Sequence, residues 1–454
     1  MSSIEQGMTP PADVPAMPVD PNAFSNVVKA GPTKQADRIR SLDVLRGFAV
    51  LGILAMNITT FAIPFAAYAN PNWNGPASDA DMLTWKIMLF MFDMKMMTIF
   101  SMLFGAGIVL MASRRDAAGK GVYALHYKRI GWLFLFGFIH SALFWNGDIL
   151  ALYAACGVLV ILVRKLPAVW LILIGMLLIA FASAVNFAVG LSFDHWPADA
   201  QSEMMKGLGE FWSPSAKQLD EQMAMYGGGP FDLMSFLSIT GERIIFAILA
   251  VPFAFIFMWG WRAMGNMLIG MALYKMGVFS AKRSMAFYVA MTVLGFGIGW
   301  SLIAQAPGAY EAAEWGAVDS MFIISQWNYW GSLFVALGWV GVIMLVCKAQ
   351  LPVLCTIRHA FACTGQMALT NYLMQTILCT TFFFPYGFGQ FGDFTRSQLY
   401  IVVGTIWALQ LIWSPIWMKH FRFGPFEWAW RSLTYWKRQP MRRLPVAPTP
   451  ATAG

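Results

Sequence analysis

Long apolar segments separated by short polar ones dominate this chain from about residue 40 to residue 420. A run of about 20 apolar residues is long enough to cross a bilayer as an α-helix. The pattern predicts ten such spans, at residues 42–64, 84–112, 130–145, 148–163, 167–192, 244–275, 285–305, 329–347, 363–384 and 398–418. The segment 244–275 contains Pro252 and Arg262, so it is either one broken helix or a helix followed by a half-helix.

The composition places these segments in a membrane. Hydrophobic residue types make up 58% of the 454 residues and charged types only 12%, whereas soluble domains contain about 25% charged residues. The sequence therefore predicts an all-α fold, a polytopic bundle of about ten transmembrane helices with the lipid bilayer as its main partner. It gives no oligomeric state.

The distribution of Lys and Arg predicts the orientation, because cytoplasmic loops are enriched in both. With the N-terminus inside, most basic residues fall on the inner side. The outer side keeps Lys86, Lys206, Lys217, Arg243 and Arg396. Both termini are then cytoplasmic. The net charge of +8 follows from this bias and from the anionic lipid of the inner surface, so we expect no nucleic acid as a partner.

The two ends of the chain differ from the rest. Residues 1–34 are rich in Pro, Ala and Ser and lack the apolar core of a signal peptide, so a disordered cytoplasmic lead is predicted. Residues 438–454 are predicted to form a disordered basic tail. The five cysteines show no metal-ligand spacing, so neither a disulfide nor a metal site is expected.

A histidine and an aspartate flank the turn between the third and fourth spans, His140 and Asp148. Ionisable residues at membrane depth are costly and often functional. The topology places this turn at the outer end of both helices. There the two residues differ in depth by about five residues, roughly 7.5 Å, so a hydrogen bond requires both side chains to lean together or a bridging water.

Two interpretations of this pair stand side by side. A carboxylate bound to one ring nitrogen of His140 would make the other nitrogen a better base toward a hydroxyl or an amine. Alternatively, Asp148 caps the fourth helix and His140 is a satisfied buried donor.

Two further charged pairs lie in the first and second spans. Asp43 and Arg46 share a helix face, and they either anchor the helix at the interface or bind a phosphate at the cytoplasmic mouth. Asp93 and Lys95 do not face each other and need partners on other helices. Interhelical ion pairing is one interpretation, and a place for Lys95 on a substrate or cofactor path is the other. Asp43, Arg46 and Lys95 are therefore the candidate cofactor-binding residues.

Polar side chains without charge supply the candidate substrate-binding residues, Asn57, Trp73, Asn74, Asn371 and Gln375. Asn371 and Gln375 share a face of the ninth span at i, i+4. Polar residues in membrane helices most often join helices by hydrogen bonds. The alternative is that they line a polar cavity.

Several segments resemble known families. The opening of the first span, Arg38-Ile-Arg-Ser-Leu-Asp-Val-Leu-Arg-Gly47, resembles the first helix of membrane acyltransferases, both the bacterial type-3 group and the heparan-alpha-glucosaminide N-acetyltransferase group. The blocks 100–107, 137–157, 365–375 and 424–435 resemble the YeiB family of bacterial inner-membrane proteins. These resemblances imply a multi-pass protein of the bacterial inner membrane. They also imply an acyltransferase-like half at residues 35–265 and a YeiB-family half at residues 266–437.

The acyltransferase resemblance also bears on the catalytic base. In the heparan acetyltransferase group a histidine lies just before a Trp-Asn-Gly sequence and accepts or relays the acetyl group. Here Trp73-Asn-Gly is present, but Asn70 stands at the position of the histidine, and an amide cannot do that chemistry. His140 is then the histidine placed to act as the base, with Asp148 orienting it.

The leading hypothesis is therefore transmembrane acyl transfer. The donor would be a cytoplasmic acyl-CoA near Arg46, with no tightly bound cofactor, and the acceptor an extracytoplasmic sugar hydroxyl or amine. Asn57 and Asn74 would contact a developing oxyanion. The alternative is a proton-coupled transporter or exporter of a small polar solute, which the intramembrane charges would serve equally well.

Overall fold

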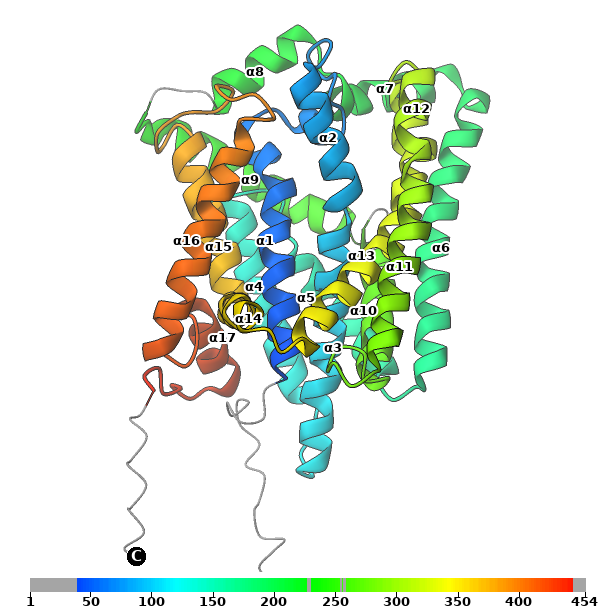
Figure 1. Cartoon of the computed structure of the whole chain (residues 1–454). Coiled ribbons are helices and arrows are strands. Elements are labelled where there is room, and N and C mark those ends of the chain that lie inside the picture. Colours follow the sequence, from blue (N-terminus) through cyan, green and yellow to red (C-terminus); the bar gives the residue numbers. More distant parts are fainter. Residues whose placement is uncertain (1–38, 227–229, 254, 256–258, 444–454) are drawn as a thin grey trace, which may run out of the picture.

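The computed structural model describes residues 39–226, 230–253, 255 and 259–443, and within them the regular structure is helical. The helices stand side by side in one bundle (Figure 1). The predicted all-α class is confirmed for this part of the chain. The predicted lead at 1–34 and the end of the predicted basic tail lie outside the described residues.

Six helical stretches among the described residues are long and apolar enough to cross a membrane. They are Arg40–Ala62 (α1), Asp79–Ala117 (α2, Asp79–Met91, followed by α3, Lys95–Ala117), Ala168–His195 (mainly α6, Ala168–Ser192), Met285–Ala312 (α11, Met285–Ile303, and α12, Gln305–Ala312), Asp319–Lys348 (mainly α13, Ser325–Lys348) and Leu399–His420 (α16). Each coincides with one of the ten predicted spans.

The other four predicted spans correspond to helices outside these six stretches. They are α4 (Tyr123–Leu143), α5 (Leu150–Val160), the pair α9 (Leu233–Phe253) and α10 (Gly260–Lys275), and the pair α14 (Pro352–Gln366) and α15 (Ala368–Phe383). Two helices, α9 and α10, therefore occupy the segment 244–275, which agrees with both of its interpretations. The total of ten crossings remains a prediction.

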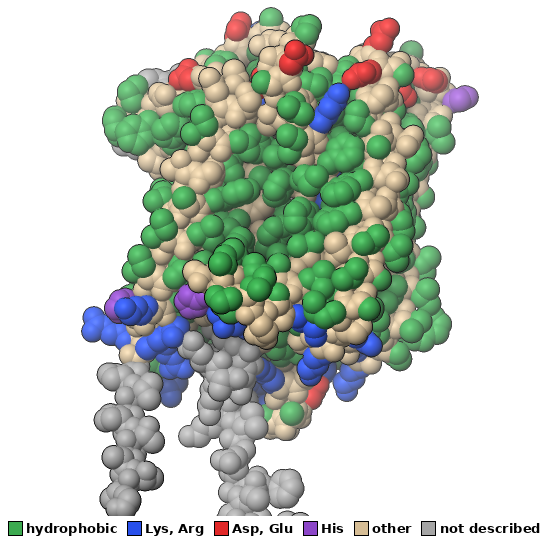
Figure 2. Space-filling model, viewed as in Figure 1, with side chains coloured by type: hydrophobic (Ala, Val, Ile, Leu, Met, Phe, Trp, Pro, Cys, Tyr) green, Lys and Arg blue, Asp and Glu red, His purple; other side chains and the backbone are tan. Residues whose placement is uncertain are grey.

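The two ends of the bundle carry opposite charge (Figure 2). Asp and Glu gather at the end where α7 (Ala198–Trp212) and α8 (Ala216–Tyr226) lie, which we call the acidic end. Lys and Arg gather at the end where α1 begins, α16 ends and α17 (Pro425–Tyr435) lies, which we call the basic end. This separation is the pattern that cytoplasmic enrichment of basic residues produces. Which end faces the cytoplasm remains a prediction.

Helix α1 is the central element. In its most apolar window 78% of the residues are buried, against 28% for α6 and α16, which form part of the periphery.

The close approach of α3 and α10 depends on glycine residues at their crossing. A Cβ on Gly105 of α3 would lie 1.9 Å from the Met267 oxygen of α10, and a Cβ on Gly270 would lie 2.0 Å from the Met102 oxygen. Such small-residue crossings allow backbones to meet in membranes. The predicted boundary between residues 265 and 266 falls inside α10.

Candidate functional site

The hairpin of α4 and α5 carries the candidate catalytic residues. Asp148 caps α5, because its Oδ2 accepts a hydrogen bond from the Ala151 N–H at 2.9 Å. Gly137 allows the start of α5 to approach α4, since a Cβ there would lie 2.4 Å from the Ala151 nitrogen and 2.6 Å from Asp148 Oδ2. The structural interpretation of Asp148 as a helix cap is therefore confirmed, and one carboxylate oxygen remains for another partner.

That second oxygen binds the histidine directly. His140 Nδ1 and Asp148 Oδ1 are 2.8 Å apart, and their side chains are 3% and 1% exposed. The depth difference expected from the sequence is closed because α5 begins only at Leu150, so Asp148 belongs to the turn that folds back beside α4. The Trp145 N–H bonds to the His140 carbonyl at 3.1 Å within this turn.

A third residue completes the arrangement. His140 Nε2 lies 3.0 Å from Thr376 Oγ1 of α15. A carboxylate accepts only, so Nδ1 must carry a proton and donate it to Asp148. Neutral His140 then has an unprotonated Nε2, to which the Thr376 hydroxyl donates. The order Asp148, His140, Thr376 is that of a carboxylate, a base and a hydroxyl in hydrolases that use a nucleophile.

Aromatic side chains enclose these three residues. The ring of Tyr372, one turn before Thr376 on α15, lies 5.3 Å from the His140 ring, and the Trp145 ring lies 6.4 Å from it. The Tyr372 side chain is 4% exposed, and its hydroxyl lies next to the backbone of Ile149 at the start of α5.

The cluster lies near the middle of the bundle. Gln375, next to Thr376, donates to the Val50 carbonyl at 3.1 Å. Val50 is ten residues from the start of α1 at Arg40, which corresponds to about 15 Å, half of a hydrocarbon core of about 30 Å. His140 lies in the last turn of α4, as the sequence predicted. Because α5 has only 11 residues, this end of the hairpin lies near the middle of the bundle.

The second charged pair lies at a break between α2 and α3. Met94 adopts a left-handed conformation with φ 61°. Asp93 accepts hydrogen bonds from the Tyr68 hydroxyl at 2.9 Å and from Asn328 Nδ2 at 2.7 Å. Lys95 Nζ donates to Asn328 Oδ1 at 2.5 Å and to a backbone carbonyl of α2. The two charges are thus joined through one amide of α13, not through an ion pair.

The amides of α15 connect helices. Asn371 Nδ2 donates to Ser414 Oγ at 3.1 Å, and its Oδ1 accepts from Trp413 Nε1 at 2.8 Å. Gln375 Nε2 donates to Gln410 Oε1 at 2.8 Å. These contacts join α15 to α16 and agree with the helix-joining interpretation of both residues. In this structure the amide nitrogens point at protein partners.

The remaining candidate residues lie apart from the hairpin cluster in the chain. Arg46 and Asp43 form the expected pair at the basic end, with 3.0 Å between NH1 and Oδ1. Asn57 is half-buried on α1, Trp73 is half-buried in the loop that precedes α2, and Asn74 is exposed there. Among the described residues, no hydrogen bond or ion pair joins any of these five to His140.

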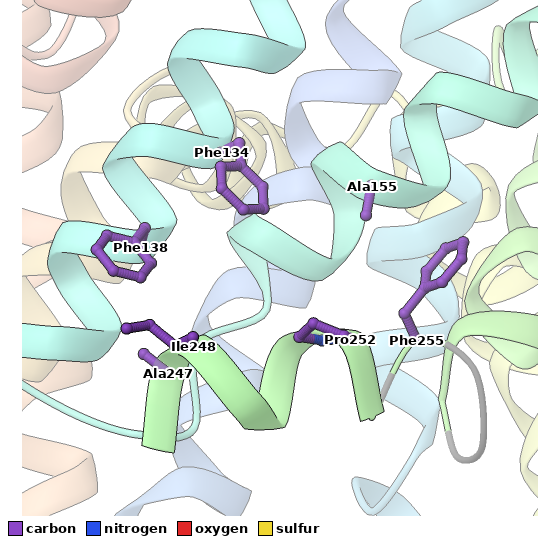
Figure 3. A pocket seen from close by; sticks show the side chains of 7 residues that line it. All are labelled: Phe134, Phe138, Ala155, Ala247, Ile248, Pro252 and Phe255. Atoms are coloured by element: carbon purple, nitrogen blue, oxygen red, sulfur yellow. The ribbon is translucent and has the colours of Figure 1, made fainter. Parts of the chain in front are cut away.

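Two cavities adjoin the bundle. The first, about 350 Å³, lies between α4, α5 and α9 (Figure 3) and is lined by Phe134, Phe138, Ala155, Ala247, Ile248, Pro252 and Phe255. This lining suits a hydrocarbon chain and offers no group for acid–base chemistry. The second, about 620 Å³, lies where α10 ends, and its lining includes Lys275, Lys282 and Arg283. No group of three His, Cys, Asp or Glu side chains in the described part of the chain is placed to hold a metal.

Comparisons with known proteins point to one family. Residues 273–437 match the model described as "Protein of unknown function (DUF418)". The uncharacterized protein YeiB of Escherichia coli strain K12 is 32% identical over 404 residues, covering 88% of this chain and 96% of YeiB. The uncharacterized protein YxaH of Bacillus subtilis strain 168 is 31% identical over 427 residues, covering 91% of this chain and 98% of YxaH.

Proposed function

The chain belongs to the family of YeiB and YxaH, and we propose that it is a membrane-bound acyltransferase. It would transfer an acyl group from a cytoplasmic acyl-CoA to a sugar hydroxyl or an amine on the opposite side of the bacterial inner membrane. The observation that carries the proposal is the hydrogen-bonded series of Asp148, His140 and Thr376 near the middle of the bundle.

The chemistry follows from the tautomer. Asp148 holds the proton on Nδ1, so Nε2 is the basic nitrogen and can take the proton of a hydroxyl or an amine that attacks a thioester carbonyl. The carboxylate stabilises the imidazolium that forms. General base catalysis of this kind contributes about 10²–10⁴-fold in rate. The side chains are closed off in this structure, so substrates reach them when α15 and the hairpin separate.

The donor would enter from the basic end. Arg46 is 30% exposed, and its charge lies close enough to Arg129 of α4 for the two to repel each other. Arg129 also stacks on Trp430 of α17, 4.9 Å from the ring centroid. Two guanidinium groups suit the phosphates of CoA. Arg129 is eleven residues before His140 on the same helix, about 16.5 Å along its axis. The extended arm of CoA that carries the thioester would therefore run along α4 from Arg129 toward His140.

The test uses the protein in nanodiscs with acetyl-CoA and candidate glycan acceptors, with free CoA thiol as the readout. His140→Gln and Asp148→Asn should lower thiol release by about 100-fold or more. The matched control is His126→Gln. His126 is also buried on α4, but its Nε2 meets the Gly157 carbonyl at 2.8 Å instead of a carboxylate. Equal thiol release by the wild type and both hairpin variants would refute the proposal.

A second candidate function rests on the broken helix of α2 and α3. Discontinuous membrane helices carry the substrate and ion sites of many transporters, and Asp93 and Lys95 lie at such a break. Proton coupling would then operate on Asp93. The test is proton uptake into liposomes under an imposed potential, read by a pH-sensitive dye. Asp93→Asn should abolish it, and Asp116→Asn, an acid paired with Arg164 at 2.7 Å at the basic end, should not.

A further inference from the structure

We infer that Thr376 is an acyl carrier, the nucleophile that accepts the acyl group from the thioester and then passes it to the acceptor. This inference rests on the proposed acyltransferase function and deepens it. No sequence pattern selects this residue, because Thr376 is 236 residues from His140 along the chain.

The hydroxyl of Thr376 differs from those of comparable threonines. Thr364, Thr380 and Thr434 donate to the carbonyl four residues earlier in their helices, at 3.0, 2.8 and 2.7 Å, as buried helical threonines commonly do. Thr376 Oγ1 instead lies 3.0 Å from His140 Nε2. Its proton therefore points at a base that a carboxylate orients, which is the arrangement of an activated hydroxyl nucleophile.

The first half-reaction is a transfer from sulfur to oxygen. Thr376 Oγ attacks the thioester carbonyl carbon while His140 Nε2 takes the hydroxyl proton. The tetrahedral intermediate collapses, the carbon–sulfur bond breaks, and the proton on Nε2 passes to the leaving thiolate. The products are free CoA thiol and an ester on Thr376, and no oxidant, reductant or metal is required.

The second half-reaction is a transfer from oxygen to the acceptor. A hydroxyl or an amine attacks the ester carbonyl, and His140 Nε2 takes its proton. As the ester bond breaks, that proton returns to Thr376 Oγ, and the starting state is restored. One base thus serves both directions.

Tyr372 fits the same site. It is one helical turn before Thr376, it is buried, and its ring lies 5.3 Å from the His140 ring. A hydroxyl donor beside the reacting carbon would stabilise the negative oxygen that develops in both half-reactions. The covalent step also answers a geometric need, because donor and acceptor come from opposite sides and a carrier at mid-depth lets them use the site in turn.

The experiment treats nanodisc-embedded protein with acetyl-CoA alone, without an acceptor. Peptide mass spectrometry is expected to find an acetyl group on Thr376, with a burst of thiol release no greater than one per chain. Thr376→Val keeps the side-chain shape, removes the hydroxyl, and should lose both the label and the burst. Thr376→Ser should keep them. Thr380→Val, one turn later on α15, is the matched control and should behave as wild type.

The outcomes separate the carrier from the proposed function. If wild type releases thiol in the presence of an acceptor but no label forms on Thr376 and Thr376→Val turns over at the wild-type rate, the carrier is refuted and direct transfer at His140 stands. A label on His140 instead of Thr376 also refutes it. If no variant and no wild-type sample releases thiol above background, the acyltransferase proposal itself fails. Thermal unfolding of Thr376→Val and Thr376→Ser tests whether both variants are folded.

Discussion

The packing of the hairpin makes Gly137 the most informative position for a test that needs no substrate. In Gly137→Ala the new Cβ would lie 2.4 Å from the Ala151 nitrogen, 2.6 Å from Asp148 Oδ2 and 2.9 Å from Leu150 Cβ. Ordinary contacts of a Cβ begin at 3.4 Å, so the start of α5 must move away by about 1 Å. The clash is with the Ala151 backbone and with the Asp148 carboxylate that caps α5, and neither group can rotate out of the way.

The magnitude follows from two opposing terms. Overpacking of a tight contact costs about 1–3 kcal/mol, whereas Ala in place of Gly inside a helix contributes about 0.5–1 kcal/mol in the stabilising direction. The net expectation is a loss of up to about 2.5 kcal/mol, with a midpoint of about 1 kcal/mol. Because the displaced atoms include Asp148 Oδ2, the 2.8 Å contact between His140 and Asp148 should lengthen with it.

The control lies on the same helix. A Cβ on Gly131 of α4 meets nothing within 4 Å, so Gly131→Ala carries only the favourable helix term of about 0.5–1 kcal/mol. Thermal unfolding of both variants in the same detergent should give a lower midpoint for Gly137→Ala and an equal or higher one for Gly131→Ala. Equal midpoints for the two variants would show that the start of α5 can move away from α4 at little energetic cost. The argument that the position of α5 determines the contact between His140 and Asp148 would then be wrong.

Two further stability predictions use the same kind of paired comparison. Gly105→Ala should lower the unfolding midpoint because its Cβ would lie 1.9 Å from the Met267 oxygen, while Gly107→Ala, whose Cβ meets nothing within 4 Å, should not; a lower midpoint for both would contradict the crossing geometry. Glu427→Ala should cost about 1–3 kcal/mol, because Glu427 Oε1 accepts the first N–H groups of α15 at 2.6 and 3.1 Å and they would be left unsatisfied. Glu311→Ala removes an exposed pair at 4.0 Å and should change the midpoint little, so equal losses would refute the reasoning.

The helical class and most helix positions could be predicted because they depend on local pattern. Apolar runs of sufficient length identified the segments that became α1, α6, α11, α13 and α16. The capping role of Asp148 followed from its place just before an apolar run, and the shared helix face of Asp43 and Arg46 followed from their spacing. Each of these features is decided within a few residues of the chain.

The contacts of the candidate site depend on distant segments, and the sequence could not show them. Nothing near His140 indicates that α15 supplies Thr376. The break at Met94 has neither Gly nor Pro to predict it. Helix length, not composition, sets the depth of the hairpin, and the end of α5 could not be placed to within a turn from its apolar run.

Asn70, which stands where the heparan acetyltransferase group has a histidine, has a structural role in this protein. Asn70 Nδ2 donates to the Trp212 carbonyl at 2.9 Å, and its Oδ1 accepts from the Asn72 N–H at 2.9 Å. Both faces of the amide are therefore used to hold the loop after α1 against α7, at the acidic end. Asn70 therefore stabilises the loop, and its amide is not basic enough to accept a proton. Under the proposed function the loop covers the bundle, and proton transfer is left to the His140 cluster, where the imidazole lies within hydrogen-bond distance of both a carboxylate and a hydroxyl.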